Sequence, residues 1–252
     1  MKILVIGATG ATGRLLVKEL LERGLSVRVV VRDASRLDES LHGEPALSVV
    51  EASIAEMTDD EIQALVAGCA GAACCLGHNL TFKGLFGPPY RLVTDATRRL
   101  CRALRAESHD EARRFVLMNT TGVRNPDLNE RISIPQRIVI LALRLLLPPH
   151  ADNEGAARHL RRSIGPSDPD LEWAAVRPDG LVDHPDVTEY ELHPSPTRSA
   201  IFDAGQTSRI NVAHFMASLL TDPELWARWK GMTPVIYNAP QTSTPGAADE
   251  AR

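Results

Sequence analysis

The sequence predicts an α/β protein with a doubly wound parallel sheet. Three observations predict this fold class. The chain opens with a short apolar run, residues 3–6, which a glycine-rich turn and an amphipathic segment follow. Further short apolar runs alternate with helical patterns along most of the chain. With 252 residues and 44% hydrophobic content, the chain is long enough to bury one large core of this kind.

The predicted elements follow one another in the order that such a fold requires. Residues 3–6 fit a strand buried on both faces, and leucines at 15, 16, 20 and 21 continue with helical spacing to Gly24. Further strands are predicted at Ser26–Val31, Ala46–Val50, Gly71–Leu76, Arg114–Met118 and Leu171–Val176. Further helices are predicted at Thr58–Ala67 with Thr58 as the N-cap, around Arg91–Arg105, and at Ile132–Leu147.

The chain is expected to form a single domain over residues 1–238, because no internal repeat divides it. Residues 179–206 hold several prolines and histidines without a clear helical pattern. They follow the last predicted strand, where a small substrate-covering region would lie. Residues 239–252 are rich in Thr, Ser, Pro, Ala and Glu and have little to bury, which predicts a disordered tail.

Three glycines, Gly7, Gly10 and Gly13, stand at every third position between the first strand and the first helix. A strand that turns sharply into a helix leaves unpaired N–H groups, where the helix dipole favours a negative charge. Glycines let a pyrophosphate approach those groups, so the pattern predicts a dinucleotide site. The expected contacts are Gly7, Thr9, Gly10, Ala11, Thr12, Gly13 and Arg14.

The end of the second strand indicates which dinucleotide binds. An acid there accepts hydrogen bonds from the ribose of NAD, whereas a cation suits the 2′-phosphate of NADP. Arg32 and Asp33 stand side by side at this point, and Asp33 is also a natural N-cap for the next turn. With Arg14 near the same phosphate, we favour NADP(H) over NAD(H); Arg14 and Arg36 as plain surface arginines are the alternative.

A long loop, residues 77–90, follows the fourth predicted strand at the sheet edge where ligands of such folds bind. Gly77 is expected to contact the cofactor. Glycines and aromatic residues suit a flap over a flat or apolar ligand, with His78, Phe82 and Phe86 as candidate substrate contacts. Ordinary loop packing is the alternative for these side chains.

Charge and cysteine content restrict the partners. A net charge of −4 and an isoelectric point of about 6.1 provide no field that attracts nucleic acid or an anionic membrane. The four cysteines lack the spacing of metal ligands, so no metal is proposed, and we interpret them as reduced thiols of a cytoplasmic protein. The apolar stretch Ile138–Leu147 is interrupted by Arg144 and is too short to span a bilayer.

Several motifs in order resemble the atypical short-chain dehydrogenase/reductases of the NmrA-like or NAD(P)H-binding group. They are Gly-Ala-Thr-Gly-Ala-Thr-Gly at 7–13, Val-Val-Val-Arg-Asp at 29–33, Phe-Val-Leu-Met-Asn-Thr-Thr-Gly-Val at 115–123, Glu-Trp-Ala-Ala-Val-Arg-Pro at 172–178 and Thr-Ser-Arg-Ile-Asn-Val-Ala-His-Phe at 207–215. The resemblance extends from residue 1 to about 238. It implies a Rossmann-type fold with a small C-terminal substrate region.

The catalytic residues of the resembled family are only partly present. Its tyrosine-dependent members use Ser, Tyr and Lys, the last two as Tyr-x-x-x-Lys. Here Thr120 falls at the serine position, His150 at the tyrosine position and Glu154 at the lysine position, so the Tyr and Lys pair is absent. His150 and Glu154 form a candidate acid/base pair, because a carboxylate one turn away stabilises a charged imidazole. Alternatively, His150 is only part of a helix entry, with Asp152 or Asn153 as the cap.

Three functions remain open at this stage. The first is an NADPH-dependent reductase of a small organic acceptor, quinone- or flavin-like, that takes its proton from a side chain or from solvent. The second is a redox sensor that binds NADP(H) without turnover, which the missing Tyr and Lys favour. The third is an isomerase, dehydratase or epimerase on the same scaffold.

The helix predicted at Ile132–Leu147 carries more apolar residues than one core face needs. They are Ile138, Ile140, Leu141, Leu145 and Leu146. We expect these side chains to be buried within the monomer. The alternatives are that they cover the active site or pack against a partner chain, so the sequence allows a monomer or a homodimer.

Overall fold

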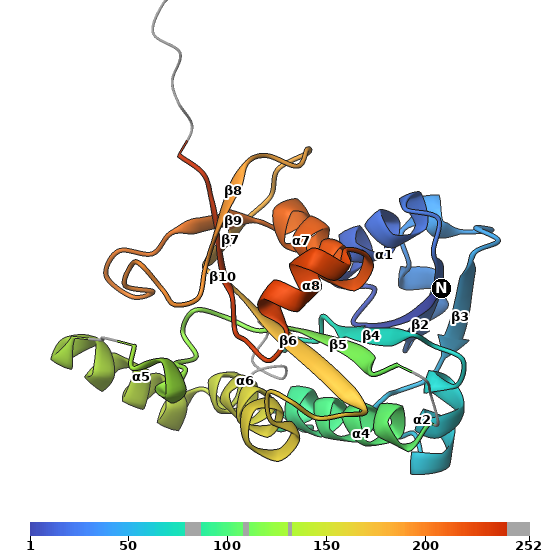
Figure 1. The fold of residues 1–252 in the computed structure, drawn as a ribbon, viewed down its shortest axis with the longest axis horizontal. Coiled ribbons are helices and arrows are strands. Elements are labelled where there is room, and N and C mark those ends of the chain that lie inside the picture. The colour runs from blue at the N-terminus through green and yellow to red at the C-terminus, as the bar shows by residue number, and fades with distance from the viewer. Residues whose placement is uncertain (79–86, 108–110, 131–132, 241–252) are drawn as a thin grey trace, which may run out of the picture.

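The computed structural model describes residues 1–78, 87–107, 111–130 and 133–240 (Figure 1). Its main sheet has the strand order β3-β2-β1-β4-β5-β6-β10-β8, with the first seven strands parallel and β8 antiparallel at the edge. The order reverses between β1 and β4, as in a doubly wound fold. In chain order these strands are β1 (Lys2–Ile6), β2 (Ser26–Val31), β3 (Leu47–Glu51), β4 (Gly71–Cys74), β5 (Arg113–Met118), β6 (Leu171–Pro178), β8 (Tyr190–His193) and β10 (Val235–Asn238).

Helices cover both faces of the sheet (Figure 1). One face carries α1 (Ala11–Glu22), α7 (Arg209–Thr221) and α8 (Pro223–Trp229). The other carries α2 (Asp59–Val66), α4 (Leu92–Ala106) and α6 (Pro148–His159), which a π-helical turn, η4 (Leu160–Ile164), extends. The doubly wound parallel sheet predicted from the sequence is thus confirmed.

Successive side chains along each strand point to opposite faces of the sheet, and so they contribute to two hydrophobic cores, one on each face. Ile3 and Val5 of β1 face the α1 and α7 side, whereas Leu4 and Ile6 face the α2 and α4 side. All four side chains are buried, because helices cover the sheet on both faces. This accounts for the unbroken apolar run at the N-terminus.

Local signals determine several helix ends. Thr58 caps α2 as predicted, since its hydroxyl accepts from the Glu61 N–H while the Glu61 carboxylate accepts from the Thr58 N–H. Other boundaries differ by one or two residues from the predictions. The third strand begins and ends one residue later, and the fourth stops at Cys74 instead of Leu76.

The apolar helix predicted at Ile132–Leu147 forms α5 (Ile134–Leu146), but its expected burial within the monomer is wrong. Ile138 is 63% exposed and Leu141 55%, and Leu146 is exposed as well. Figure 1 shows why: α5 extends away from the sheet at one end of the molecule. Within the described part of the chain, no helix is both long and apolar enough to cross a membrane.

Residues 179–206 contain short strands rather than helices. β7 (Gly180–Val182) pairs in parallel with β9 (Gln206–Ser208), and β8 extends the main sheet beside β10. This small region lies at the same end of the molecule as α5 (Figure 1). Residues 179–206 and α5 therefore both lie beyond the carboxyl ends of the central strands.

Candidate functional site

The glycine turn joins β1 to α1 where parallel α/β sheets bind their ligands. Gly7 has φ +84°, a left-handed conformation that favours glycine. A Cβ atom at Gly7 would lie 2.6 Å from the Cys75 backbone, and one at Gly13 would lie 2.1 Å from the Gly7 carbonyl oxygen. The first and third glycines are therefore required for the packing of the turn itself.

Gly10 has a different role from its two neighbours. It is the N-cap of α1, it is exposed, and no side chain caps the helix. A Cβ atom there would approach only the Gly7 carbonyl oxygen, at 3.2 Å. The first N–H groups of α1 are thus open to an anion, which fits the pyrophosphate of a dinucleotide. The predicted contacts Thr9, Ala11, Thr12 and Arg14 belong to this turn.

Arg32 and Asp33, at the end of β2, have different roles in the structure. Asp33 Oδ1 accepts hydrogen bonds from the Ser35 N–H at 3.0 Å and the Ser35 hydroxyl at 2.6 Å. These bonds lower the pKa of Asp33, which is the N-cap of the turn Ala34–Arg36. Arg32 is exposed and forms no ion pair with any described residue. The acid is committed to a cap, and the cation is available to a ligand.

The predicted pair His150 and Glu154 lies at the start of α6, one helical turn apart. His150 Nε2 is 3.5 Å from Glu154 Oε1, and Arg144 Nε of α5 is 3.1 Å from Glu154 Oε2. Hydrogen bonding with His150 lowers the pKa of Glu154, and the nearby Arg144 acts in the same direction against the effect of burial. Glu154 is therefore ionised at neutral pH and can stabilise a positive charge on the imidazole.

Thr120 faces the same point as His150. A Cβ atom built on Gly122 would lie 3.6 Å from His150 Cε1 and 3.7 Å from Thr120 Oγ1. The Thr120 hydroxyl accepts from the Gly122 N–H at 3.2 Å and keeps its own proton for donation. The structure thus brings Thr120, His150 and Glu154 together between β5 and α6.

The Asn119 side chain connects the two elements that carry these residues. Its amide donates to the carbonyl oxygen of Asn153 in α6 at 3.1 Å, and its oxygen accepts from the Thr120 N–H at 2.8 Å. Asn119 itself is buried at the end of β5. Sequence reasoning did not single out this link, because its partner lies 34 residues away along the chain.

Asp152 is the clearest correction to the sequence analysis, which considered it a cap of its own helix. α6 begins at Pro148 without a side-chain cap. The fully buried Asp152 carboxylate instead accepts from the N–H groups of Val93 and Thr94 at 2.8 Å each, in the first turn of α4. One feature of the sequence could have indicated this contact. Arg91, the residue before α4, has no side chain suited to cap that helix, so another segment has to supply the cap.

His78 also contacts Asp152. Its Nε2 lies 2.8 Å from Asp152 Oδ2, and its side chain is 6% exposed. Gly77, beside it, is exposed with nothing near the position of a Cβ atom, as a close approach of the cofactor would require. The other predicted substrate contacts, Phe82 and Phe86, lie outside the described residues.

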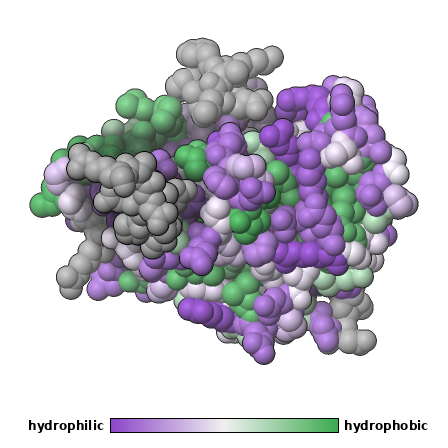
Figure 2. Space-filling view, turned by 90° about the horizontal axis from the view of Figure 1, so that it is seen from above, coloured by the Kyte–Doolittle hydropathy of each residue, from purple (hydrophilic) through white to green (hydrophobic). Residues whose placement is uncertain are grey.

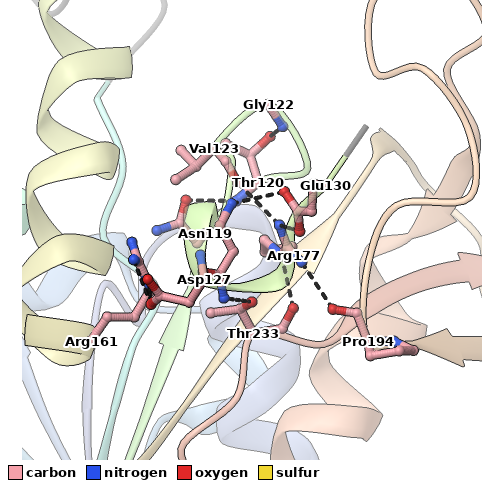
Figure 3. A network of polar contacts seen from close by, with 11 residues as sticks. Asn119, Thr120, Gly122, Val123, Asp127, Glu130, Arg161, Arg177, Pro194 and Thr233 are labelled. Carbon is pink, nitrogen blue, oxygen red and sulfur yellow. Dashed lines mark hydrogen bonds and ion pairs between the residues drawn. The ribbon is translucent and has the colours of Figure 1, made fainter. Parts of the chain in front are cut away.

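Figure 3 shows a buried polar network at the end of β6 that the sequence did not predict. Arg177 is 1% exposed, and its guanidinium lies 2.7 Å from Glu130 Oε1. It also donates to the carbonyl oxygens of Val123, Pro194 and Thr233. Burial lowers the pKa of Arg177. The network ties the loop after β5 to residues 179–206.

A cavity of about 310 Å³ opens beside this network. The loop after β5 contributes Thr121, Gly122 and Arg124, and α5 contributes Gln136. Glu130, Ile140 and residues 196–200 and 203 complete the lining. Part of the region 179–206 therefore faces the loop that carries Thr120, as expected of a substrate-covering region.

The chain is similar to several known proteins in sequence or in fold. An uncharacterized chloroplastic protein of Arabidopsis thaliana is 26% identical over 223 residues, which cover 88% of this chain and 73% of the relative. A short-chain dehydrogenase/reductase of Veillonella parvula, solved in complex with NADP, is 16% identical, with a TM-score of 0.67 over 98% of both chains. A Streptococcus pneumoniae protein, assigned as an NADH-flavin reductase, is 17% identical, with a TM-score of 0.65 over 95% of this chain and 100% of that one.

These solved structures share the fold. Residues 7–223 match the family model described as NAD(P)H-binding, which spans most of the chain, from the glycine turn to the start of α8. The chain belongs to this NAD(P)H-binding family.

Proposed function

We propose that this protein is an NADPH-dependent reductase of a small conjugated organic acceptor, of the quinone or flavin kind. One observation carries the cofactor preference: at the end of β2, Arg32 is exposed while Asp33 already caps the following turn. A cation suits the 2′-phosphate of NADP, and an aspartate committed to a cap is a poor acceptor for the free hydroxyl of NAD. Arg14, exposed one residue after the third glycine, supports the same preference.

The bound cofactor supplies the hydride, and the acceptor then needs one proton to complete a two-electron reduction. His150 is the proposed proton donor, with Glu154 stabilising the charged imidazole from 3.5 Å. The Thr120 hydroxyl is the proposed donor that orients an acceptor oxygen or ring nitrogen. The absence of Tyr-x-x-x-Lys favours an acceptor whose conjugation lowers the demand for acid catalysis.

The acceptor class also has support from a relative. The Streptococcus pneumoniae protein that shares the fold is assigned as an NADH-flavin reductase. The loop that carries Thr120 also lines a cavity with residues 196–200 and 203, so the small region 179–206 can cover an acceptor held near Thr120.

The test measures oxidation of NADPH by absorbance with purified protein and a panel of benzoquinones, naphthoquinones and flavin mononucleotide. We expect consumption that depends on the acceptor. In calorimetry, Arg32→Ala should weaken NADPH binding about tenfold or more and leave NADH binding unchanged. Arg228→Ala, on α8, is the matched control. Equal affinity for both cofactors before and after the Arg32 change would refute the NADP preference.

A redox sensor that binds NADP(H) without turnover is the second candidate, because the Tyr and Lys pair is absent. It predicts tight and selective binding of one redox form. It also predicts no consumption of NADPH with any acceptor of the panel, and this result would replace the reductase assignment.

A further inference from the structure

A groove between α5 and α6 lies near the candidate site, and the proposed reductase does not yet explain it. Its volume is about 590 Å³. The α5 wall is aliphatic, with Ile134, Ile138, Ile140 and Leu141, of which Ile134 is 72% exposed. Hydrophobic side chains gather at the left end of Figure 2, the end at which α5 lies in Figure 1. An exposed apolar patch of this kind marks a binding surface.

The groove also carries strong positive charge, from Arg137 of α5 and from arginines of the loop after β5, α6 and η4. Arg124, Arg137, Arg158 and Arg162 line it, are exposed, and form no ion pair with any residue that the structure describes. Two further lining arginines are already paired: Arg144 with Glu154 and Arg161 with Asp127. The groove thus combines apolar surface with unpaired positive charge, which complements an amphipathic anion.

The groove is continuous with the candidate site. Glu154, which lies 3.5 Å from His150, is itself one of its lining residues. Arg158 and Arg162 follow Glu154 by four and eight residues, which corresponds to about 6 and 12 Å along a helix at about 1.5 Å per residue. Glu154 therefore repels the negative group of a bound ligand from the end of the groove next to His150. Arg158 and Arg162 attract that group at the other end.

We propose that this groove binds the substrate of the reductase as an elongated amphipathic anion. Its reacting end faces His150 and Glu154, its apolar body lies on α5, and its negative group pairs with Arg158 and Arg162. This inference rests on the proposed function and adds a substrate class to it. A groove of this volume lies in the range typical of small-molecule sites.

Two other occupants fit the groove less well. A second copy bound through a two-fold contact at this groove would bring two sets of these unpaired arginines into one interface, and like charges held close together are unfavourable. A lipid bilayer is flat, whereas here the arginines and the aliphatic side chains line a concave groove. A single free molecule can contact the basic and the aliphatic side chains at once.

Titration calorimetry with sodium decanoate, 1-decanol and sodium acetate tests the proposal on the full chain. We expect decanoate to bind one site at least tenfold more tightly than decanol, and acetate to give no heat. Arg158→Gln with Arg162→Gln should weaken decanoate about tenfold and leave decanol unchanged. Leu141→Ser should weaken both ligands. Because all three side chains are exposed, folding should be unaffected.

Two matched controls, Arg228→Gln on α8 and Val49→Ser on β3, should change neither ligand. Equal affinity for decanoate and decanol, or arginine variants that bind decanoate normally, would overturn the proposal. Two further results would also overturn it. One is a protein that sediments with phosphatidylglycerol vesicles but does not bind decanoate, and the other is a dimer that Leu141→Ser dissociates. Because decanoate binding needs no cofactor, it can succeed while NADPH binding fails, and the two proposals remain separately testable.

Discussion

Asp152→Ala should destabilise the protein more than the loss of an ordinary helix cap. The substitution removes the acceptor of two backbone N–H groups, at Val93 and Thr94, each bonded at 2.8 Å. Both residues are buried, 0% and 3% exposed, so their N–H groups depend on this carboxylate and not on bulk solvent. A buried donor without a partner costs about 1–3 kcal/mol, so two cost about 2–6 kcal/mol. This is a large part of the roughly 5–15 kcal/mol that stabilises a domain.

Thr58→Ala is the matched control, because Thr58 also caps a helix but lies at the surface. Its loss should cost about 1 kcal/mol. Urea unfolding monitored by the fluorescence of the three tryptophans, all of them buried, compares the two variants with the parent protein. Asp152→Asn, which keeps one acceptor oxygen, should lie between them. An Asp152→Ala loss no greater than that of Thr58→Ala would refute the reasoning that burial amplifies this cap.

Three further predictions follow from contacts in the structure. Gly13→Ala should prevent folding in circular dichroism, because a Cβ atom would lie 2.1 Å from the Gly7 carbonyl oxygen. Gly10→Ala, with φ −79°, should fold and lose only NADPH affinity in calorimetry; an unfolded Gly10→Ala would contradict this division of roles. Glu154 has a pKa below its ordinary value of 4.5, so the stability it provides is present above that value and is lost as the pH falls through the lower, folded value. The difference in urea midpoint between the parent and Glu154→Gln should therefore shrink below pH 4.5, and a constant difference would contradict this. Glu130→Gln leaves Arg177 charged and unpaired in the interior and should cost about 3–5 kcal/mol in urea unfolding. Asp203→Asn breaks the exposed pair with Arg198 and should cost less than about 1 kcal/mol; similar losses for the two variants would argue against a buried ion pair.

The sequence predicted what depends on residues close together in the chain. The glycine turn, the parallel strands and the Thr58 cap are of this kind, since Thr58 and Glu61 are three residues apart. The single domain over residues 1–238 and the cytoplasmic location stay predictions from the sequence alone. The gathering of Thr120, His150 and Glu154 followed from the resemblance to a family and could not come from spacing, because two separate elements supply them.

What the sequence did not predict depends on contacts between distant segments. Asp152 serves a helix 59 residues away, and Arg177 reaches Thr233 across 56 residues. Periodicity cannot show which end of which helix a carboxylate will cap. The exposure of α5 was missed for a related reason: an apolar pattern shows that a surface needs a partner but does not show whether the same chain supplies it.

α6 carries both the Asp152 carboxylate that caps α4 and the proposed acid/base pair His150 and Glu154. These three residues lie on two opposite faces of its first turns. His150 and Glu154 are four residues apart and share one face, whereas Asp152, two residues from each, is turned by about 200° to the opposite side at 3.6 residues per turn. The bonds of Asp152 to α4 therefore determine how α6 is rotated, and this rotation directs His150 and Glu154 toward Thr120. A folded Asp152→Asn variant should consequently lose catalytic rate, through the positions of His150 and Glu154 and through the contact of Asp152 with His78.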